Sequence, residues 1–211
     1  MQILLAKTAG FCFGVNRAVK LTYDLLSQGH RIATLGPLIH NPQVVSDLEH
    51  RGALTCDTVD EVPDGYEVII RSHGVPQAVY DKISTRSLAY HDATCPFVAK
   101  IHKIAVEAGR NGAFLLVAGD RKHPEVQGIV GHTTGEVRTF ANISELEELL
   151  PLLKQQKSIY VVAQTTFHVQ SWETCKEFLK KQCTNSKIFD TICNATWARQ
   201  QEAEDLSQKC D

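Results

Sequence analysis

The sequence lacks the features that direct a chain to a membrane or to nucleic acid. Its N-terminus has no basic leader followed by an apolar run, and no later stretch approaches the roughly 20 apolar residues of a membrane span. The formal net charge is −2, so the chain has no overall positive field for nucleic acid or for an anionic membrane. We expect a cytoplasmic protein with neither partner, whose anionic ligands are bound by local groups in a small pocket.

The sequence also lacks a CxxC pair, although it contains seven cysteines. The missing pair argues against zinc-finger and thioredoxin-like sites, and the odd number argues against a disulfide framework. Thiol exchange is disfavoured because even the nearest two cysteines, Cys175 and Cys183, are not adjacent in sequence. Nucleotide binding is disfavoured because neither GxGxxG nor a P-loop motif follows the first expected strand. A metal site would therefore have to be assembled from distant segments.

Short apolar runs alternate with helix-period segments along the chain, which is typical of α/β folds built from βα units on parallel sheets. At 211 residues, and with roughly 100 to 150 residues per domain, the length favours two such units. The segment after Cys193 is polar and helix-prone, with a thin apolar stripe. The expected strands are residues 2–6, 31–35, 67–71, 88–91, 114–118, 136–140, 158–163 and 187–189.

Two cysteines repeat the same local pattern. Residues 91–95 (HDATC) and 189–193 (FDTIC) both give a strand end, an aspartate, two further residues, the cysteine and then a helix. Cys12 occupies the same kind of strand-to-helix junction, and the three junctions are separated by about the length of a small α/β domain. We expect three units: a first lobe at residues 1–95, a second lobe at 96–193, and the helical start of a third at 194–211.

Cysteines at such junctions are suited to hold a metal. In open α/β sheets the helix N-termini point free N–H groups into the crevice at the strand ends, which favours thiolate and lowers a cysteine pKa. Thiolates from Cys12, Cys95 and Cys193 could hold a [4Fe–4S] cluster, which usually takes four cysteines, and leave one iron open for substrate. A zinc site with three thiolates and one histidine is the competing metal hypothesis. The cysteines outside this setting, expected to be structural, are Cys56, Cys175, Cys183 and Cys210.

Three histidines also share a position, after an apolar run and shortly before a proline that suits a helix start. They are His40, His73 and His123. Imidazoles beside the free backbone N–H groups of helix N-termini form a suitable receptor for a diphosphate. The other histidines, for which a solvated or structural role is expected, are His30, His50, His91, His102, His132 and His168.

Glu125 lies two residues beyond His123, so both side chains can project toward one crevice. In a desolvated pocket burial raises the pKa of a carboxyl group, and Glu125 could then deliver a proton. The alternative is a surface charge that complements the helix dipole. Thr165 and Thr166 follow another apolar run and offer hydroxyl donors, although such residues also suit a simple helix N-cap.

These segments together resemble the hydroxymethylbutenyl diphosphate reductase family, which catalyses the last step of the non-mevalonate isoprenoid pathway. The matches run through the whole chain in order, and as a set they are highly specific. The matching segments are residues 10–15 (GFCFGV), 39–41 (IHN), 72–75 (SHGV), 92–96 (DATCP), 123–126 (HPEV), 164–166 (QTT), 192–196 (ICNAT) and 199–200 (RQ).

The resemblance implies an oxidoreductase that removes the allylic hydroxyl of 4-hydroxy-3-methylbut-2-enyl diphosphate with two electrons and two protons, giving isopentenyl and dimethylallyl diphosphates. It implies a [4Fe–4S] cofactor and an electron-donor protein such as ferredoxin or flavodoxin. The implied site residues are Cys12, Cys95 and Cys193 as cluster ligands, His40, His73 and His123 as diphosphate contacts, Glu125 as the acid, and Thr165 with Thr166 as substrate-contacting hydroxyls.

The resemblance further implies a trefoil-like fold of three lobes around a central site, of which this chain contains two. Family members continue into a third lobe whose Ser- and Asn-rich loops match nothing in residues 1–211, so we expect the chain alone to turn over poorly. The alternative function is a non-catalytic metal or anion sensor that uses the same cysteines and histidines. Iron and sulfide in the protein would favour the reductase, and zinc would favour the sensor.

Overall fold

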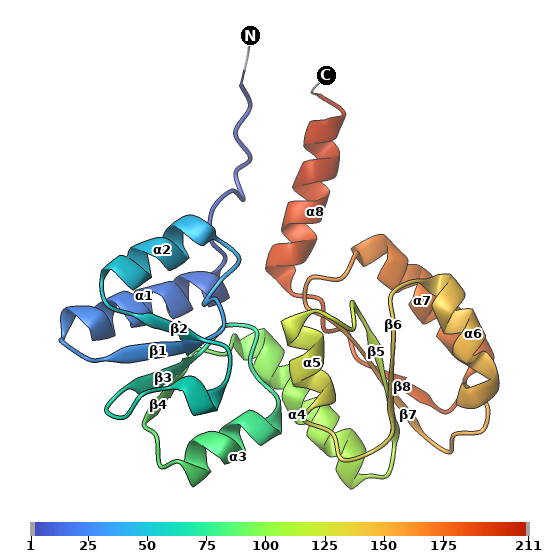
Figure 1. Cartoon of the computed structure of the whole chain (residues 1–211). Helices are drawn as coiled ribbons and strands as arrows, with labels where there is room; N and C mark the ends of the chain where they lie inside the picture. The colour runs from blue at the N-terminus through green and yellow to red at the C-terminus, as the bar shows by residue number, and fades with distance from the viewer. Residues whose placement is uncertain (1–2, 210–211) are drawn as a thin grey trace.

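Two parallel sheets, each covered by helices, form the two lobes of the molecule (Figure 1). The computed structural model describes residues 3–209. The sheets have the orders β2-β1-β3-β4 and β6-β5-β7-β8, so the second repeats the topology of the first. All of their strand pairings are parallel. The predicted α/β class with repeated parallel-sheet lobes is confirmed.

The elements follow one another in the alternating order that the apolar runs predict. None of the helices in the described part of the chain has the length and apolar character to span a membrane. The first lobe contains α1 (Phe13–Ser27), β1 (Ile32–Leu35), α2 (Pro42–His50), β2 (Leu54–Cys56), the 3-10 turn η1 (Val59–Glu61), β3 (Glu67–Ile70), α3 (Gln77–Thr85) and β4 (Tyr90–Asp92). The second contains α4 (Pro96–Arg110), β5 (Phe114–Ala118), α5 (Pro124–Val130), β6 (Val137–Phe140), α6 (Ile143–Leu153), β7 (Ile159–Ala163), α7 (Val169–Gln182) and β8 (Ser186–Ile188), followed by α8 (Asn194–Ser207).

Each sheet carries a hydrophobic core on both of its faces. In the first lobe α1 and α2 cover one face, and α3 covers the other. In the second lobe α6 and α7 cover one face, and α4 and α5 cover the other. The central strands β5 and β7 are buried along their whole length, which explains why they read as continuous apolar runs. The carboxyl ends of the central strands are therefore the places where loops can carry functional groups.

The strand predicted at residues 2–6 is wrong for the residues that the structure describes, and one strand was missed. Residues 3–6 form no strand: Ile3 and Leu5 are 78% and 84% exposed, and this segment lies outside both sheets (Figure 1). The apolar pattern is there, but no neighbouring strand pairs with it. The edge strand β2 was not predicted, because its sequence is short and half polar and two of its three residues are exposed. Cys210, at the end of the expected last helix, lies outside the described residues.

The N-terminal segment lies against α8, far along the chain. The carboxylate of Glu202 accepts hydrogen bonds from the backbone N–H groups of Lys7, at 2.6 Å, and Thr8, at 2.8 Å. Arg199 donates to the carbonyl of Gly10 at 2.7 Å. Since α8 has no buried residue, these polar contacts are what join it to the segment that leads into Cys12.

The two lobes meet around His102 of α4, which is 6% exposed. Its ring occupies the space left by two glycines: a Cβ on Gly128 would lie 3.2 Å from His102 Nε2, and a Cβ on Gly74 would clash with the ring. His102 also stacks on His132, with centroids 4.0 Å apart and planes at 15°. Because Gly74 belongs to the first lobe and Gly128 to the second, this imidazole fixes the loop after β3 against α5.

Candidate functional site

Three helices begin at a cysteine, and these cysteines meet in one pocket. Cys12, Cys95 and Cys193 are the N-cap residues of α1, α4 and α8. All three are partly exposed and line the same pocket, together with Glu125 and Thr165. The predicted strand-to-helix junction is wrong for Cys12, because no strand precedes α1, whereas β4 precedes Cys95 and β8 precedes Cys193. The structure nevertheless brings the three thiols to one pocket.

The main chain holds Cys95 and Cys193 in the same way in the two lobes. The N–H of Cys95 donates to the carbonyl of Ser72 at 2.9 Å, and the N–H of Cys193 donates to the carbonyl of Thr165 at 3.1 Å. Ser72 lies two residues beyond β3, and Thr165 lies two residues beyond β7. Each thiol is thus tied to the loop that follows the central strand of its own lobe.

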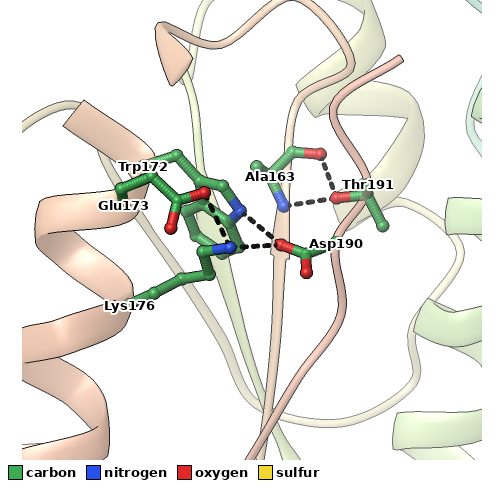
Figure 2. Close-up of polar contacts among 6 residues, drawn as sticks. All are labelled: Ala163, Trp172, Glu173, Lys176, Asp190 and Thr191. Atoms are coloured by element: carbon green, nitrogen blue, oxygen red, sulfur yellow. Dashed lines mark hydrogen bonds and ion pairs between the residues drawn. The ribbon is translucent and has the colours of Figure 1, made fainter. Parts of the chain in front are cut away.

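Side chains fix the loop that leads from β8 into Cys193 (Figure 2). Asp190 accepts from Lys176 Nζ at 2.7 Å and from the indole N–H of Trp172 at 3.1 Å. Thr191 Oγ1 accepts from the N–H of Ala163 and donates to its carbonyl, both at 2.7 Å. The bonds from Lys176, chiefly, and from Trp172 lower the pKa of Asp190. The aspartate of the FDTIC segment therefore anchors the junction to α7.

Gly14 leaves room for the Cys95 sulfur across the pocket. A Cβ on Gly14 would lie 2.6 Å from Cys95 Sγ, closer than real side chains approach. We expect Gly14→Ala to reduce the iron content of the anaerobically prepared protein severely, because the methyl group takes the space of the thiol. Gly135→Ala is the control, since Gly135 also lacks a positive φ and a Cβ there would meet its nearest neighbour, the carbonyl oxygen of Ala113, at 3.4 Å. Equal iron content in Gly14→Ala and the unchanged protein would contradict this role.

The spacing of the thiols does not fit a single zinc ion. Zinc binds each thiolate at about 2.3 Å, so sulfurs on one ion lie at most about 4.6 Å apart. Within residues 3–209, His40, His73 and His123 bring three possible metal-ligand atoms within 4.8 Å of one another. The three cysteine sulfurs do not come this close together. A cluster spreads its thiolates over different irons, so the thiol trio suits a cluster better than one ion.

The electrostatics of Cys95 differ from the prediction. Burial is the largest effect and raises the pKa of its thiol. Hydrogen bonds from the N–H groups at the start of α4 lower this pKa, and the nearby Cys12 and Cys193 raise it. The expected lowering of the pKa is wrong for Cys95, because desolvation outweighs the helix N-terminus. Bound iron would reverse the balance, since a coordinating thiol loses its proton outright.

Glu125 is the buried carboxyl group of the pocket, with 2% of its surface exposed. Its carboxylate oxygens accept from the N–H and the Oγ1 hydroxyl of Thr165 at 2.6 Å and 2.8 Å. Burial raises the pKa of Glu125, and the two hydrogen bonds oppose that rise. The structure thus places the predicted acid in the thiol pocket, with Thr165 orienting it. A surface-charge role for Glu125 does not agree with this burial.

The three predicted histidines form one cluster. Their ring centroids lie 4.7 Å apart for His40 and His73, 5.4 Å for His73 and His123, and 5.7 Å for His40 and His123. His123 caps α5, and its Nδ1 accepts from the N–H of Glu125 at 3.1 Å, which leaves Nε2 as the donor. Burial, followed by the charges of its neighbours, lowers the pKa of His73 to about 3. Burial also lowers the pKa of His123.

Thr166 lines the thiol pocket beside Thr165. Its hydroxyl accepts from the side-chain amide of Gln164 at 2.9 Å, which leaves the hydroxyl proton free to donate into the pocket. The structure therefore brings all nine predicted site residues together in two adjoining groups: the thiols with Glu125 and the threonines, and the three histidines. Of the nine, Cys12 follows no strand.

Sequence reasoning missed one residue beside the histidines. Arg71 directly follows β3 and lies two residues before His73, and its charge lowers the pKa of both His73 and His123. The sequence signal that could have identified Arg71 is a cation at the end of a buried strand.

The cysteines that were expected to be structural lie away from the pocket. Cys56, Cys175 and Cys183 are buried in the cores of the two lobes.

Comparisons with known proteins match the chain along its length. The family model described as LytB protein matches residues 3–211. The 4-hydroxy-3-methylbut-2-enyl diphosphate reductase of Thermoanaerobacter sp. (strain X514) is 40% identical over 215 residues, covering 100% of this chain and 73% of the relative. That of Citrifermentans bemidjiense is 42% identical over 214 residues, with the same coverage. A solved structure of (E)-4-hydroxy-3-methyl-but-2-enyl diphosphate reductase, the terminal enzyme of the non-mevalonate pathway, is 36% identical with a TM-score of 0.80, and covers 99% of this chain and 74% of that one.

Proposed function

We propose that this chain, which belongs to the LytB family, acts in the reductive dehydroxylation of 4-hydroxy-3-methylbut-2-enyl diphosphate to isopentenyl and dimethylallyl diphosphates. The chain is an oxidoreductase of the non-mevalonate isoprenoid pathway, like the relatives that it matches. The observation that carries the proposal is the meeting of three N-cap thiols and a buried glutamate in one pocket. A passive sensor has no need of a desolvated acid beside its ligand.

The donor set fits an iron–sulfur cluster. Cys12, Cys95 and Cys193 supply three thiols from separate segments, and the missing Cβ of Gly14 keeps the space beside the Cys95 sulfur open. We assign these cysteines as the ligands of a [4Fe–4S] cluster. A [4Fe–4S] cluster held by these three cysteines would supply the electrons for the reduction, and its fourth iron would have no ligand from this chain.

The histidine cluster is assigned to the diphosphate. His123 presents its Nε2–H as a donor because its Nδ1 is taken by the N–H of Glu125. With pKa values lowered by burial, His73 and His123 are neutral imidazoles at pH 7, which can donate a hydrogen bond to a phosphate oxygen. His123 and Glu125 lie at the start of one helix, so the diphosphate and the acid are positioned by the same element.

Glu125 is assigned as the proton donor. Loss of the allylic hydroxyl as water consumes two electrons and two protons, and the leaving oxygen must receive a proton. Because burial raises the pKa of Glu125, a larger fraction of this carboxyl keeps its proton near neutral pH than in an exposed glutamate. Thr165 holds the carboxyl in place, and Thr166 offers a further hydroxyl toward the substrate.

The remaining assignments follow from the same family. The substrate is a small allylic diphosphate, and we propose that a cytoplasmic electron-donor protein such as ferredoxin or flavodoxin supplies the electrons. We divide the chain into lobes at residues 1–95 and 96–193, with residues 194–211 as the start of a third unit, because the two sheets lie within the first two ranges.

Metal analysis tests the proposal. The protein is prepared without oxygen, and iron, acid-labile sulfide and zinc are measured together with the visible absorption spectrum. We expect a brown protein with close to equal iron and sulfide, since each iron of a [4Fe–4S] cluster is matched by one sulfide. Zinc in stoichiometric amount with no sulfide would overturn the reductase and favour the sensor.

A further inference from the structure

We propose that the guanidinium of Arg71 is a further binding group for the diphosphate, beside the three histidines. This inference rests on the proposed function, because it assumes that the histidine cluster receives the diphosphate. It adds a residue that carries a permanent positive charge to a site whose other donors are imidazoles.

Arg71 lies where the loops of two histidines converge. It directly follows β3, two residues before His73. Its guanidinium packs against Gly36, the first residue after β1, in the loop that carries His40: a Cβ on Gly36 would lie 2.8 Å from one terminal nitrogen of Arg71. Gly36 has φ of +71°, so a glycine is favoured there on backbone grounds as well as by the space that the guanidinium fills. The side chain is thus held between two loops of the site.

The charge of Arg71 has no protein partner within residues 3–209. The ion pairs found there use other cations, and Arg71 Nε is buried without a hydrogen bond. Burial alone lowers the pKa of Arg71, with no carboxylate acting against it. A partly buried guanidinium whose Nε is cut off from solvent and has no anion is unfavourable, and its fork of donors matches the oxygens of a phosphate. A bound diphosphate would satisfy it.

The second lobe contains an internal comparison. Gln164 follows β7 as Arg71 follows β3, and it packs against Gly119, which follows β5 as Gly36 follows β1. Gln164 has partners at both ends of its amide, since its oxygen accepts from the N–H of Asp120 at 3.3 Å and its nitrogen donates to Thr166 at 2.9 Å. The repeated position therefore accommodates a neutral, hydrogen-bonded side chain, and the fold does not require a cation there. The unpartnered arginine is specific to the lobe that contributes His40 and His73.

The permanent charge of Arg71 matters for diphosphate binding because His73 beside it is neutral. Burial and the charges of His40, His123 and Arg71 lower the pKa of His73 to about 3, so this imidazole is neutral in the site without a ligand. A neutral imidazole donates a hydrogen bond but does not neutralise a phosphate, whereas a guanidinium stays charged at all working pH values. Arg71 therefore supplies the attraction for the anion, and the histidines orient it.

Calorimetric titration with inorganic diphosphate tests the proposal on the protein as prepared, with a chelator present to keep free metal ions off the histidines. Arg71→Gln gives the first lobe the residue that the second lobe has, so it should fold. We expect it to weaken diphosphate binding about 10- to 100-fold, the loss typical of a charge-assisted hydrogen bond. Arg71→Lys should bind with intermediate affinity, because an ammonium keeps the charge but loses the fork.

Arg31→Gln is the matched control. Arg31 precedes β1 at the opposite end of the same sheet, where its guanidinium stacks on Tyr66 at 4.3 Å, and its loss should leave diphosphate binding unchanged. Unchanged affinity in a folded Arg71→Gln protein would overturn the role of Arg71 and leave the reductase intact. Equal weakening in both variants would also overturn it, since only net charge would matter. A cluster-containing protein that binds no diphosphate would overturn the assignment of the histidines and, with it, this inference.

Discussion

Replacing Cys95 with serine is expected to abolish cluster assembly, with iron and sulfide falling to background in the anaerobically prepared protein. A serine hydroxyl does not ionise near neutral pH and is a poor ligand for iron, so the cluster would lose one of its three protein ligands. The substitution removes one sulfur atom from a half-buried position, and the N–H of residue 95 still donates to the carbonyl of Ser72. The loss of iron should therefore occur in a folded chain, which circular dichroism can verify.

Cys56→Ser is the matched control for that experiment. Cys56 is 6% exposed and packs in the core of the first lobe at the end of β2, away from the pocket of the other thiols. We expect unchanged iron content and a stability loss of about 1 kcal/mol, which is typical of a single substitution. Equal loss of iron in Cys95→Ser and Cys56→Ser would refute the assignment of the ligands.

Glu125→Gln is expected to keep the cluster and lower turnover by about 100- to 10,000-fold, the contribution typical of a positioned proton donor. The amide is nearly the same shape as the carboxyl group and can still bond to Thr165, but it cannot release a proton. Iron content and turnover with a chemical reductant are measured together, in a form of the protein that turns over before substitution. Glu147→Gln, at an exposed position of α6, is the control for loss of one negative charge. Unimpaired turnover in Glu125→Gln would remove this residue from the mechanism.

Glu125→Gln should also change how the stability of the protein depends on pH. Because the folded pKa of Glu125 is raised above its unfolded value, its contribution to stability is present below the unfolded pKa and is lost as pH rises through the folded pKa. Glu125→Gln should therefore gain stability relative to the unchanged chain as pH rises from the acid range to neutrality. Thermal unfolding of both forms at several pH values measures this. Parallel curves would mean that the carboxyl is not desolvated.

The pattern of the chain was enough to predict most of the fold. The buried strands β5 and β7 read as unbroken apolar runs because helices cover both faces of a parallel sheet, and burial of this kind is visible in composition alone. The edge strand β2 and the segment of residues 3–6 could not be predicted, because a strand also needs a partner. The half-polar β2 has one, and the apolar segment has none.

The candidate site was predictable as a set of residue types and loop positions, but not as an arrangement. The repeated aspartate and cysteine of the HDATC and FDTIC segments marked two equivalent junctions. Their convergence depends on how the two sheets pack against each other, which no local pattern reveals. The pKa of Cys95 could not be predicted, since it depends on a contest between burial and helix N–H groups. Arg71 was missed because an unpaired charge is recognisable only once every possible partner has a place in space. The roles of the individual site residues stay predictions until the variants are measured.

The hydrogen bonds that tie Cys95 to Ser72 and Cys193 to Thr165 join backbone groups alone. Such a scaffold does not depend on which side chains it displays. A side chain at these loops can therefore be exchanged for another group while the backbone that carries it keeps its place. The neighbouring Arg71 and Gln164 show this, since the same position of the two lobes holds a cation in one and an amide in the other.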